Sequence, residues 1–191
     1  MRLQFIPKDE QYADSKFIPK LEVLVGKVIS RTYDFTSDVE EIEGLNNNLS
    51  IDPEEGIIEF NELYADIQNN FNYVADVHGK ILRELSVWQN FLSQANALYR
   101  RERNRILNSD IKIKALRNQS LQEAAVQEKI PEISDLKEQL ENIIKDLKSL
   151  SLIVENKKDK LDKAAVAVNR QQRNVETMIG LNYPVKAVRA K

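Results

Sequence analysis

The chain has 191 residues, of which 30% are charged and 42% apolar, and its formal net charge is −2. It has no cysteine and one histidine, which excludes a disulfide framework, a cysteine nucleophile and a metal site rich in histidine or thiolate ligands. No uncharged apolar run approaches the ~20 residues that cross a bilayer, and charges interrupt the N-terminus where a signal peptide needs an apolar core. We therefore expect no membrane contact and a location in the cytoplasm, or inside a virion.

Charge is divided unevenly along the chain. Residues 1–77 hold 6 basic and 16 acidic side chains, a net charge of −10, whereas residues 78–191 carry +8. This asymmetry indicates either a basic surface for a polyanion or an acidic half that neutralises the basic half of a neighbouring subunit.

Residues 1–50 are predicted as an acidic segment whose structure the sequence leaves uncertain. The apolar residues between 21 and 29 alternate at first as in a strand, and they also fit one face of a helix. We favour the helix because no tight turn and second strand follow. Residues 40–43 and 46–48 are polar and predict a loop.

A long helix, the first rod, is predicted over about residues 52–107. Asp52 can cap its start, Pro53 suits the first helical position, and Asn108 to Asp110 mark its end. Along it, apolar residues keep a 4-3 spacing, the pattern of a helix that buries a narrow stripe, or seam, against a partner helix. The seam comprises Ile57, Phe60, Tyr64, Ile67, Phe71, Val74, His78, Ile81, Leu85, Trp88, Leu92, Ala95, Tyr99, Glu102 and Ile106.

Residues 108–130 are predicted as a connector with enough helix-forming residues for a shorter helix or a helical turn. Pro131 starts a second rod over about residues 131–179, Gly180 stops it, and residues 181–191 form a basic tail. Its seam comprises Leu136, Leu140, Ile143, Leu147, Leu150, Val154, Lys157, Leu161, Ala164, Val168, Gln171, Val175 and Met178.

Two rods of about 50 residues, each about 75 Å long, predict an all-α fold in which residues 51–180 form a long antiparallel helical hairpin or coiled coil. We expect Trp88 and Leu147 to be buried in the seams and no sheet to exceed two strands. Further apolar residues widen the apolar face beyond the reach of one partner helix, which predicts a homo-oligomer. These flanking residues are Leu63, Val77, Leu82, Phe91, Leu98, Ile144 and Ile153.

Catalytic constellations are almost absent from the sequence. His78 is expected to pack in the seam, and the five glycines are too scattered for a phosphate-binding loop. Carboxylates fall on helix faces beside lysines, where solvated pairs are the ordinary outcome. We expect no enzymatic activity, no cofactor and no metal.

Basic side chains are better candidates for a binding surface, because Arg and Lys at this density can neutralise phosphates. A solvated helix face is the alternative reading. The tail adds an aromatic ring beside positive charge, a combination that single-stranded nucleic acid uses. The candidate nucleic-acid-binding residues are Arg100, Arg101, Arg103, Arg105, Lys157, Lys158, Lys160, Lys163, Arg170, Arg173, Tyr183, Lys186 and Arg189.

The stretch LYRRERNRILNSD, followed by a polar helical connector and LKSLSLIVENKKDKLDKAAVAVNRQQRN, resembles the pattern of phage recombination mediators related to UvsY. The resemblance covers about residues 57–179 and includes no diagnostic motif. It implies a small, helical, oligomeric protein that binds single-stranded DNA and helps to load a RecA-like recombinase in place of a single-strand-binding protein. The basic residues between 157 and 173 would match the family's basic helix, and Arg100 to Arg105 its other basic stretch. The acidic N-terminal segment departs from the pattern and is a candidate contact for a protein partner.

Two functions therefore stay open. The first is a non-enzymatic, single-stranded DNA-binding accessory protein of recombination. The second is a structural or assembly coiled-coil protein of a phage particle or another multi-subunit complex, whose charges serve subunit contacts.

Overall fold

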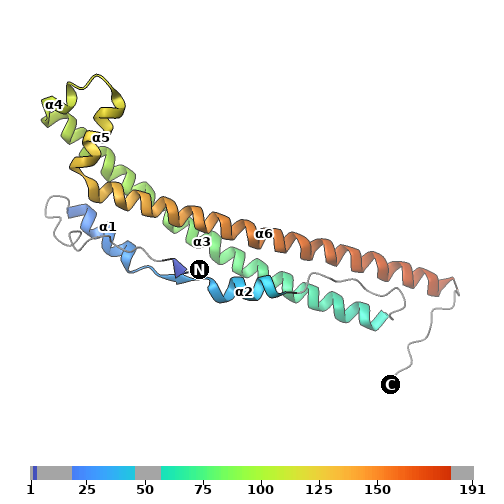
Figure 1. Cartoon of the computed structure of the whole chain (residues 1–191). Coiled ribbons are helices and arrows are strands. Elements are labelled where there is room, and N and C mark those ends of the chain that lie inside the picture. The colour runs from blue at the N-terminus through green and yellow to red at the C-terminus, as the bar shows by residue number, and fades with distance from the viewer. Residues whose placement is uncertain (1, 4–18, 46–56, 182–191) are drawn as a thin grey trace. The chain divides into compact units, whose positions relative to one another are not determined.

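The computed structural model describes residues 2–3, 19–45 and 57–181 of the chain (Figure 1). Over these residues the fold is helical, as predicted, apart from one two-stranded antiparallel ribbon. The elements in chain order are β1 (Arg2–Leu3), α1 (Pro19–Ile29), β2 (Tyr33–Asp34), α2 (Thr36–Gly44), α3 (Ile57–Ser109), α4 (Ile111–Lys114), α5 (Gln119–Lys129) and α6 (Pro131–Gly180). In the ribbon, Arg2 pairs with Asp34 and Leu3 with Tyr33.

The two long helices α3 and α6 pack against each other as a helical hairpin, which confirms the predicted fold class (Figure 1). Trp88 and Leu147 are fully buried in the seams, as expected from the 4-3 spacing. Most other seam positions are also buried, from Phe60 to Ile106 on α3 and from Leu136 to Val175 on α6. Burial of this largely apolar stripe stabilises both helices far more than their intrinsic propensity does.

Contacts divide the chain into two compact units. The first comprises residues 1–35 with 83–149, and the second comprises residues 36–82 with 150–191. Each unit therefore contains part of α3, part of α6 and one of the short N-terminal helices.

In the first unit, α1 packs its apolar face inward. Leu21, Leu24 and Val28 are almost completely buried, whereas Val23 is 59% exposed. A strand would have buried Val23 with its alternate neighbours, so the burial pattern agrees with the helix that the sequence favoured. Leu24 lines a recess together with Leu98 of α3, which places α1 beside the flank of that helix.

The connector between the long helices folds as two short helices, in agreement with the predicted helical turn. Asp110 caps α4 by accepting hydrogen bonds from the backbone N–H groups of Lys112 and Ile113, and Asn118 caps α5 through the N–H of Ser120. The Gln122 side chain donates to the backbone carbonyl oxygens at 114 and 116, at 3.2 and 2.7 Å. The turn is thus fixed by polar contacts at both of its helix starts.

In the second unit, α2 corrects a prediction. Residues 40–43, expected as a loop, are helical from Thr36 to Gly44. The prediction overlooked one apolar residue among these acidic ones, Ile42, which is buried at 1% exposed. Tyr73 of α3 also donates a hydrogen bond to Glu41 at 2.8 Å. Tertiary contacts of this kind override weak local propensity. Residues 46–48 and the predicted helix start at 52–53 lie outside the described residues.

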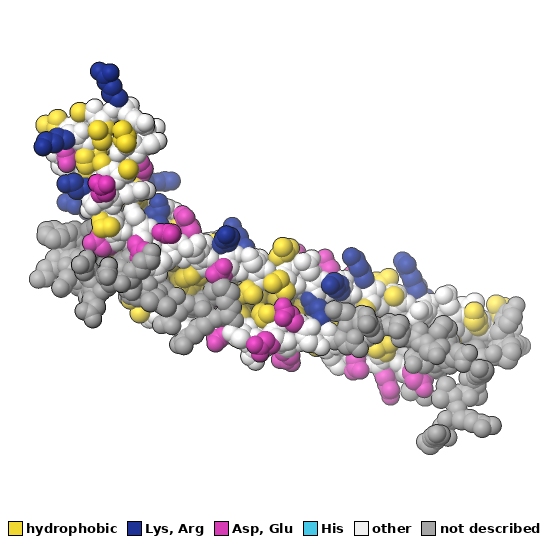
Figure 2. Space-filling model, viewed as in Figure 1, with side chains coloured by type: hydrophobic (Ala, Val, Ile, Leu, Met, Phe, Trp, Pro, Cys, Tyr) yellow, Lys and Arg dark blue, Asp and Glu magenta, His cyan; other side chains and the backbone are white. Residues whose placement is uncertain are grey.

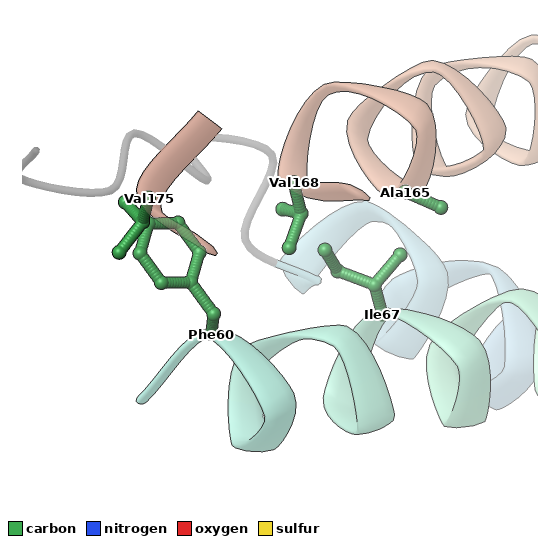
Figure 3. Close-up of a cluster of buried hydrophobic side chains, with 5 residues drawn as sticks. All are labelled: Phe60, Ile67, Ala165, Val168 and Val175. Carbon is green, nitrogen blue, oxygen red and sulfur yellow. The ribbon is translucent and has the colours of Figure 1, made fainter. Parts of the chain in front are cut away.

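The far end of the seam lies in the second unit (Figure 3). Phe60 faces Val175 there, and Ile67 lies with Ala165 and Val168 in one buried cluster. Met178, predicted as the next seam residue, is instead 53% exposed. The burial of the α6 seam within the described residues therefore ends at Val175.

The flanking apolar residues divide into three groups. Val77, Phe91, Leu98 and Ile144 are buried within the chain and need no partner subunit for their burial, and Leu63 is half-buried against the Phe60 cluster. Leu98 lies beside α1, whose Leu24 lines the same recess, and the hairpin pattern alone does not predict this contact. Leu82 and Ile153 remain 47% and 42% exposed.

Candidate nucleic-acid interface

The second unit carries a basic stripe on the outer side of α6. Lys160, Lys163 and Arg170 are exposed and form no ion pair with another described residue. At 100° per residue, these three residues fall within about 80° of the helix circumference, and none of them occupies a seam position. Figure 2 shows Lys and Arg side chains along this edge. We call Lys160, Lys163 and Arg170 the α6 stripe.

The acidic residues of this part of α6 lie beside the stripe. Asp159 and Asp162 flank it on one side, and no acidic residue falls within its arc between 156 and 174. Arg173 is exposed but lies on the flank that also holds Asp162. Figure 2 shows Asp and Glu side chains gathered on the opposite edge of this unit, over α2 and the start of α3. Apart from Asp159, which lies one turn before Lys163, the described acidic side chains of this unit lie away from the stripe, and positive charge predominates along it.

Two lysines that the sequence assigned to the interface serve the hairpin itself. Lys157 is only 7% exposed, and its Nζ donates a hydrogen bond of 2.6 Å to the backbone carbonyl of Leu45, just past α2. Burial, reinforced by the neighbouring charge of Lys160, lowers the pKa of Lys157. Lys158 is half-buried, with its Nζ 6.0 Å from the ring centre of Phe71. Lys157 is withdrawn from the surface, and this corrects its assignment.

The arginine run on α3 is also largely engaged within the first unit. Arg103 Nε donates to Glu123 of α5 at 2.7 Å, and Arg105 Nε donates to Glu102 at 2.6 Å. Arg101 lies 4.0 Å from the same Glu102. The remaining arginine of the run, Arg100, is exposed and forms no ion pair with another described residue.

Glu123 is the centre of a small polar cluster that ties α5 to α3. It accepts a hydrogen bond of 2.6 Å from the Tyr99 hydroxyl as well as that from Arg103, and these bonds lower its pKa. Burial, together with the bond to Glu123, raises the pKa of Tyr99 to about 12. Lys137 of α6 stacks its Nζ 4.2 Å from the centre of the Tyr99 ring. The cluster therefore fixes the connector on both long helices.

Sequence reasoning missed a second exposed basic group. Lys112, Lys114 and Arg117 are exposed in the α4–α5 connector, and residues 111–122 contain no acidic residue. The absence of acidic residues from this stretch could have indicated the group in the sequence, but the stretch is short and lies outside both seams.

The remaining sequence predictions concern the C-terminal tail, His78, metal ligands and membrane-spanning helices. The predicted tail residues Tyr183, Lys186 and Arg189 lie outside the described residues. His78 packs in the seam as expected, with Nε2 2.9 Å from Ser151 Oγ. Within residues 2–3, 19–45 and 57–181 there is no cluster of metal-ligating side chains, and no helix is long and apolar enough to cross a membrane. Comparison of the chain with family models, curated proteins and solved structures finds no match.

Proposed function

We propose that this chain is a non-enzymatic protein that binds single-stranded DNA through the α6 stripe and acts as a recombination accessory protein. The observation that carries the proposal is the exposure of Lys160, Lys163 and Arg170 on an acid-free arc of α6. The likeness of the sequence pattern to phage recombination mediators supports the choice of single-stranded DNA as the polyanion. Under this proposal the protein works in the cytoplasm, the host's if the chain is viral.

The physical basis of binding would be neutralisation of phosphates. The three cations are spaced over about 15 Å along the helix axis, so one flexible strand can contact all of them in turn. Released counterions make such binding depend steeply on salt. The acidic surface of α2 and the start of α3 would repel the strand and orient it toward α6. That acidic surface is then free to contact a basic protein partner.

The test replaces the α6 stripe with alanine in the full-length chain, as Lys160→Ala, Lys163→Ala and Arg170→Ala together. All three side chains are exposed outside the seam, so the helical circular dichroism spectrum should not change. Fluorescence anisotropy with a labelled oligothymidylate, followed against salt, should show weaker binding. The log–log salt slope should flatten by about 2, since each lost phosphate contact on a single strand removes about 0.7.

A matched control removes three exposed lysines elsewhere, Lys129, Lys145 and Lys148. It changes the net charge equally and should leave the affinity and the slope close to those of the parent. Equal weakening by both triple variants would show a general charge effect and overturn the stripe. Failure of the parent to bind at low salt would overturn the function itself.

A second candidate function, a structural or assembly coiled-coil protein, is favoured by one observation. Leu152, Ile153 and Val166 are 58%, 42% and 44% exposed on the same part of α6. Exposed apolar side chains at this density are typical of a helix that meets another subunit. Under this reading the chain forms a homo-oligomer and the charges select its partner. Sedimentation of the parent as a folded monomer at micromolar concentration would refute this reading, whereas an oligomer dispersed by Leu152→Ser with Ile153→Ser would support it.

A further inference from the structure

The connector end of the first unit exposes apolar and basic side chains together. Ile111 is 80% exposed and Leu121 56% exposed, the former at the start of α4 and the latter in the first turn of α5. Three exposed cations, Lys112, Lys114 and Arg117, lie within the same twelve-residue stretch of sequence. Figure 2 shows hydrophobic side chains gathered over this connector with Lys and Arg side chains around them. We call these five residues the tip surface.

The backbone that presents the tip surface is held in place before any partner arrives. Asp110 and Asn118 cap the two short helices, and Gln122 bridges the turn between them. Beneath the turn, Ile113 and Val126 are buried, at 6% and 0% exposed. A surface fixed in this way loses little conformational entropy when a ligand binds. Exposure of Ile111 and Leu121 is therefore a feature of an ordered structure.

A groove adjoins the tip surface between α3 and α5. It is lined by Arg100, Ser120, Lys137 and the Tyr99–Glu123 pair. The carboxylate of Glu123 is already occupied by Tyr99 and Arg103, so the remaining positive charge at this groove comes from Arg100 and Lys137. The groove thus continues the positive potential of the tip and supplies a recess next to Leu121.

The exposed aliphatic side chains and cations of the tip surface favour one class of partner. No aromatic ring is exposed among the connector residues 110–130 that could stack a nucleic-acid base. Ile111 and Leu121 are the only large apolar side chains exposed there, too few for the continuous apolar face of a helix that inserts into a lipid surface. An acidic peptide with apolar side chains matches both the aliphatic groups and the surrounding cations.

We propose that the tip surface and its adjoining groove dock an acidic peptide segment of a separate protein, with apolar side chains of the peptide seated on Ile111 and Leu121. The cations would pair with the peptide's carboxylates and set the rate of encounter, and the apolar contacts would set the lifetime of the complex. This interface belongs to the first unit and is independent of the α6 stripe in the second.

The probe is a fluorescein-labelled peptide of about ten residues in which aspartate alternates with leucine, measured by anisotropy against the full-length protein. We expect saturable binding that weakens with added salt. Ile111→Ser with Leu121→Ser should weaken it about ten-fold or more, because partial burial of each side chain is lost. Lys112→Ala, Lys114→Ala and Arg117→Ala together should weaken it similarly at low salt and less at high salt.

The control for the apolar pair is Val23→Ser with Ile29→Ser, which removes side chains that are 59% and 40% exposed on α1 of the same unit. It should leave peptide binding unchanged, and circular dichroism checks that every variant remains helical. A peptide with serine in place of leucine keeps its charge and should bind at least ten-fold more weakly.

Three results would overturn the proposal. The first is failure of the peptide to bind the parent at low salt, and the second is equal binding of the leucine and serine peptides. The third is loss of binding to oligothymidylate or to anionic phospholipid vesicles in the tip variants while peptide binding stays intact. Because the tip and α6 variants are separate, failure here leaves the single-stranded DNA test unaffected, and the reverse also holds.

Discussion

Neutralising Glu123 tests whether this carboxylate holds the connector helix α5 on α3. The carboxylate accepts hydrogen bonds of 2.6 Å from Tyr99 and 2.7 Å from Arg103. The side chains of Arg103 and Glu123 are 25% and 35% exposed, so solvent screens part of their attraction. With that allowance, Glu123→Gln should lower the free energy of unfolding by about 1–2 kcal/mol at neutral pH.

This loss should depend on pH. The hydrogen bonds from Tyr99 and Arg103 keep the pKa of Glu123 below its ordinary value in the folded chain. A carboxyl of this kind adds stability above its unfolded pKa of about 4.3, and that stability disappears as the pH falls through the folded pKa. The difference between the parent and Glu123→Gln should therefore be full near neutrality and should shrink as the solution is acidified below about pH 4.

Urea denaturation followed by far-ultraviolet circular dichroism measures both effects. For a chain of this size the neutral-pH midpoint should fall by about 0.5 M. Glu128→Gln is the matched control, because Glu128 is exposed on the same helix; it should change the midpoint little. Equal stability of Glu123→Gln and parent at neutral pH would refute the reasoning, and so would a difference that persists unchanged in acid.

Three further predictions also concern the first unit. Trp88 is fully buried and its indole N–H has no hydrogen-bond partner among the described residues. In chemical denaturation, Trp88→Ala should lower the free energy of unfolding by about 3–5 kcal/mol. Trp88→Phe should lower it by less than half of that, because this change also removes the unpaired donor. Arg31 binds the 6%-exposed Glu84 with bonds of 3.0 and 2.6 Å, so Arg31→Ala should speed hydrogen exchange in α1 while amides of α3 and α6 stay protected. The pKa of Tyr99 is raised to about 12, so its ultraviolet-monitored ionisation should occur at a higher pH than that of exposed tyrosines. A raised pKa gives stability that is lost as the pH rises. Above about pH 10, Tyr99→Phe should therefore lose less stability than the parent does.

The long helices could be predicted because their signal is redundant. A 4-3 spacing repeated over many turns specifies the buried face even where one position is polar, as at His78. The ends at Ser109 and Gly180 follow from local chemistry in the same way. Helix α2 was missed because its main anchor, Ile42, stands among acidic residues, and a single buried side chain leaves no periodic signal.

The candidate site was only partly accessible to sequence reasoning, because local charge does not show where a side chain is engaged. The acceptor for Lys157 is 112 residues away, at Leu45. The partner of Arg103 is 20 residues away on another helix. The exposed lysines of α6, in contrast, have helix positions that the period alone places away from the seam. Contacts between residues far apart in the sequence thus decide which cations stabilise the fold and which stay exposed for binding.

The antiparallel pairing of α3 and α6 has a consequence for how the chain folds. Partners near the connector are close in sequence, as Tyr99 and Glu123 are at a separation of 24 residues, whereas Asn61 and Gln172 at the far end are separated by 111. Closing the larger loop directly would cost about 1.4 kcal/mol more in chain entropy. A route that nucleates at the connector and zips outward avoids this cost, because each new pair then closes only a short segment. Substitutions at the Tyr99–Glu123 cluster should accordingly slow folding, whereas those at Phe60 or Val175 should mainly speed unfolding.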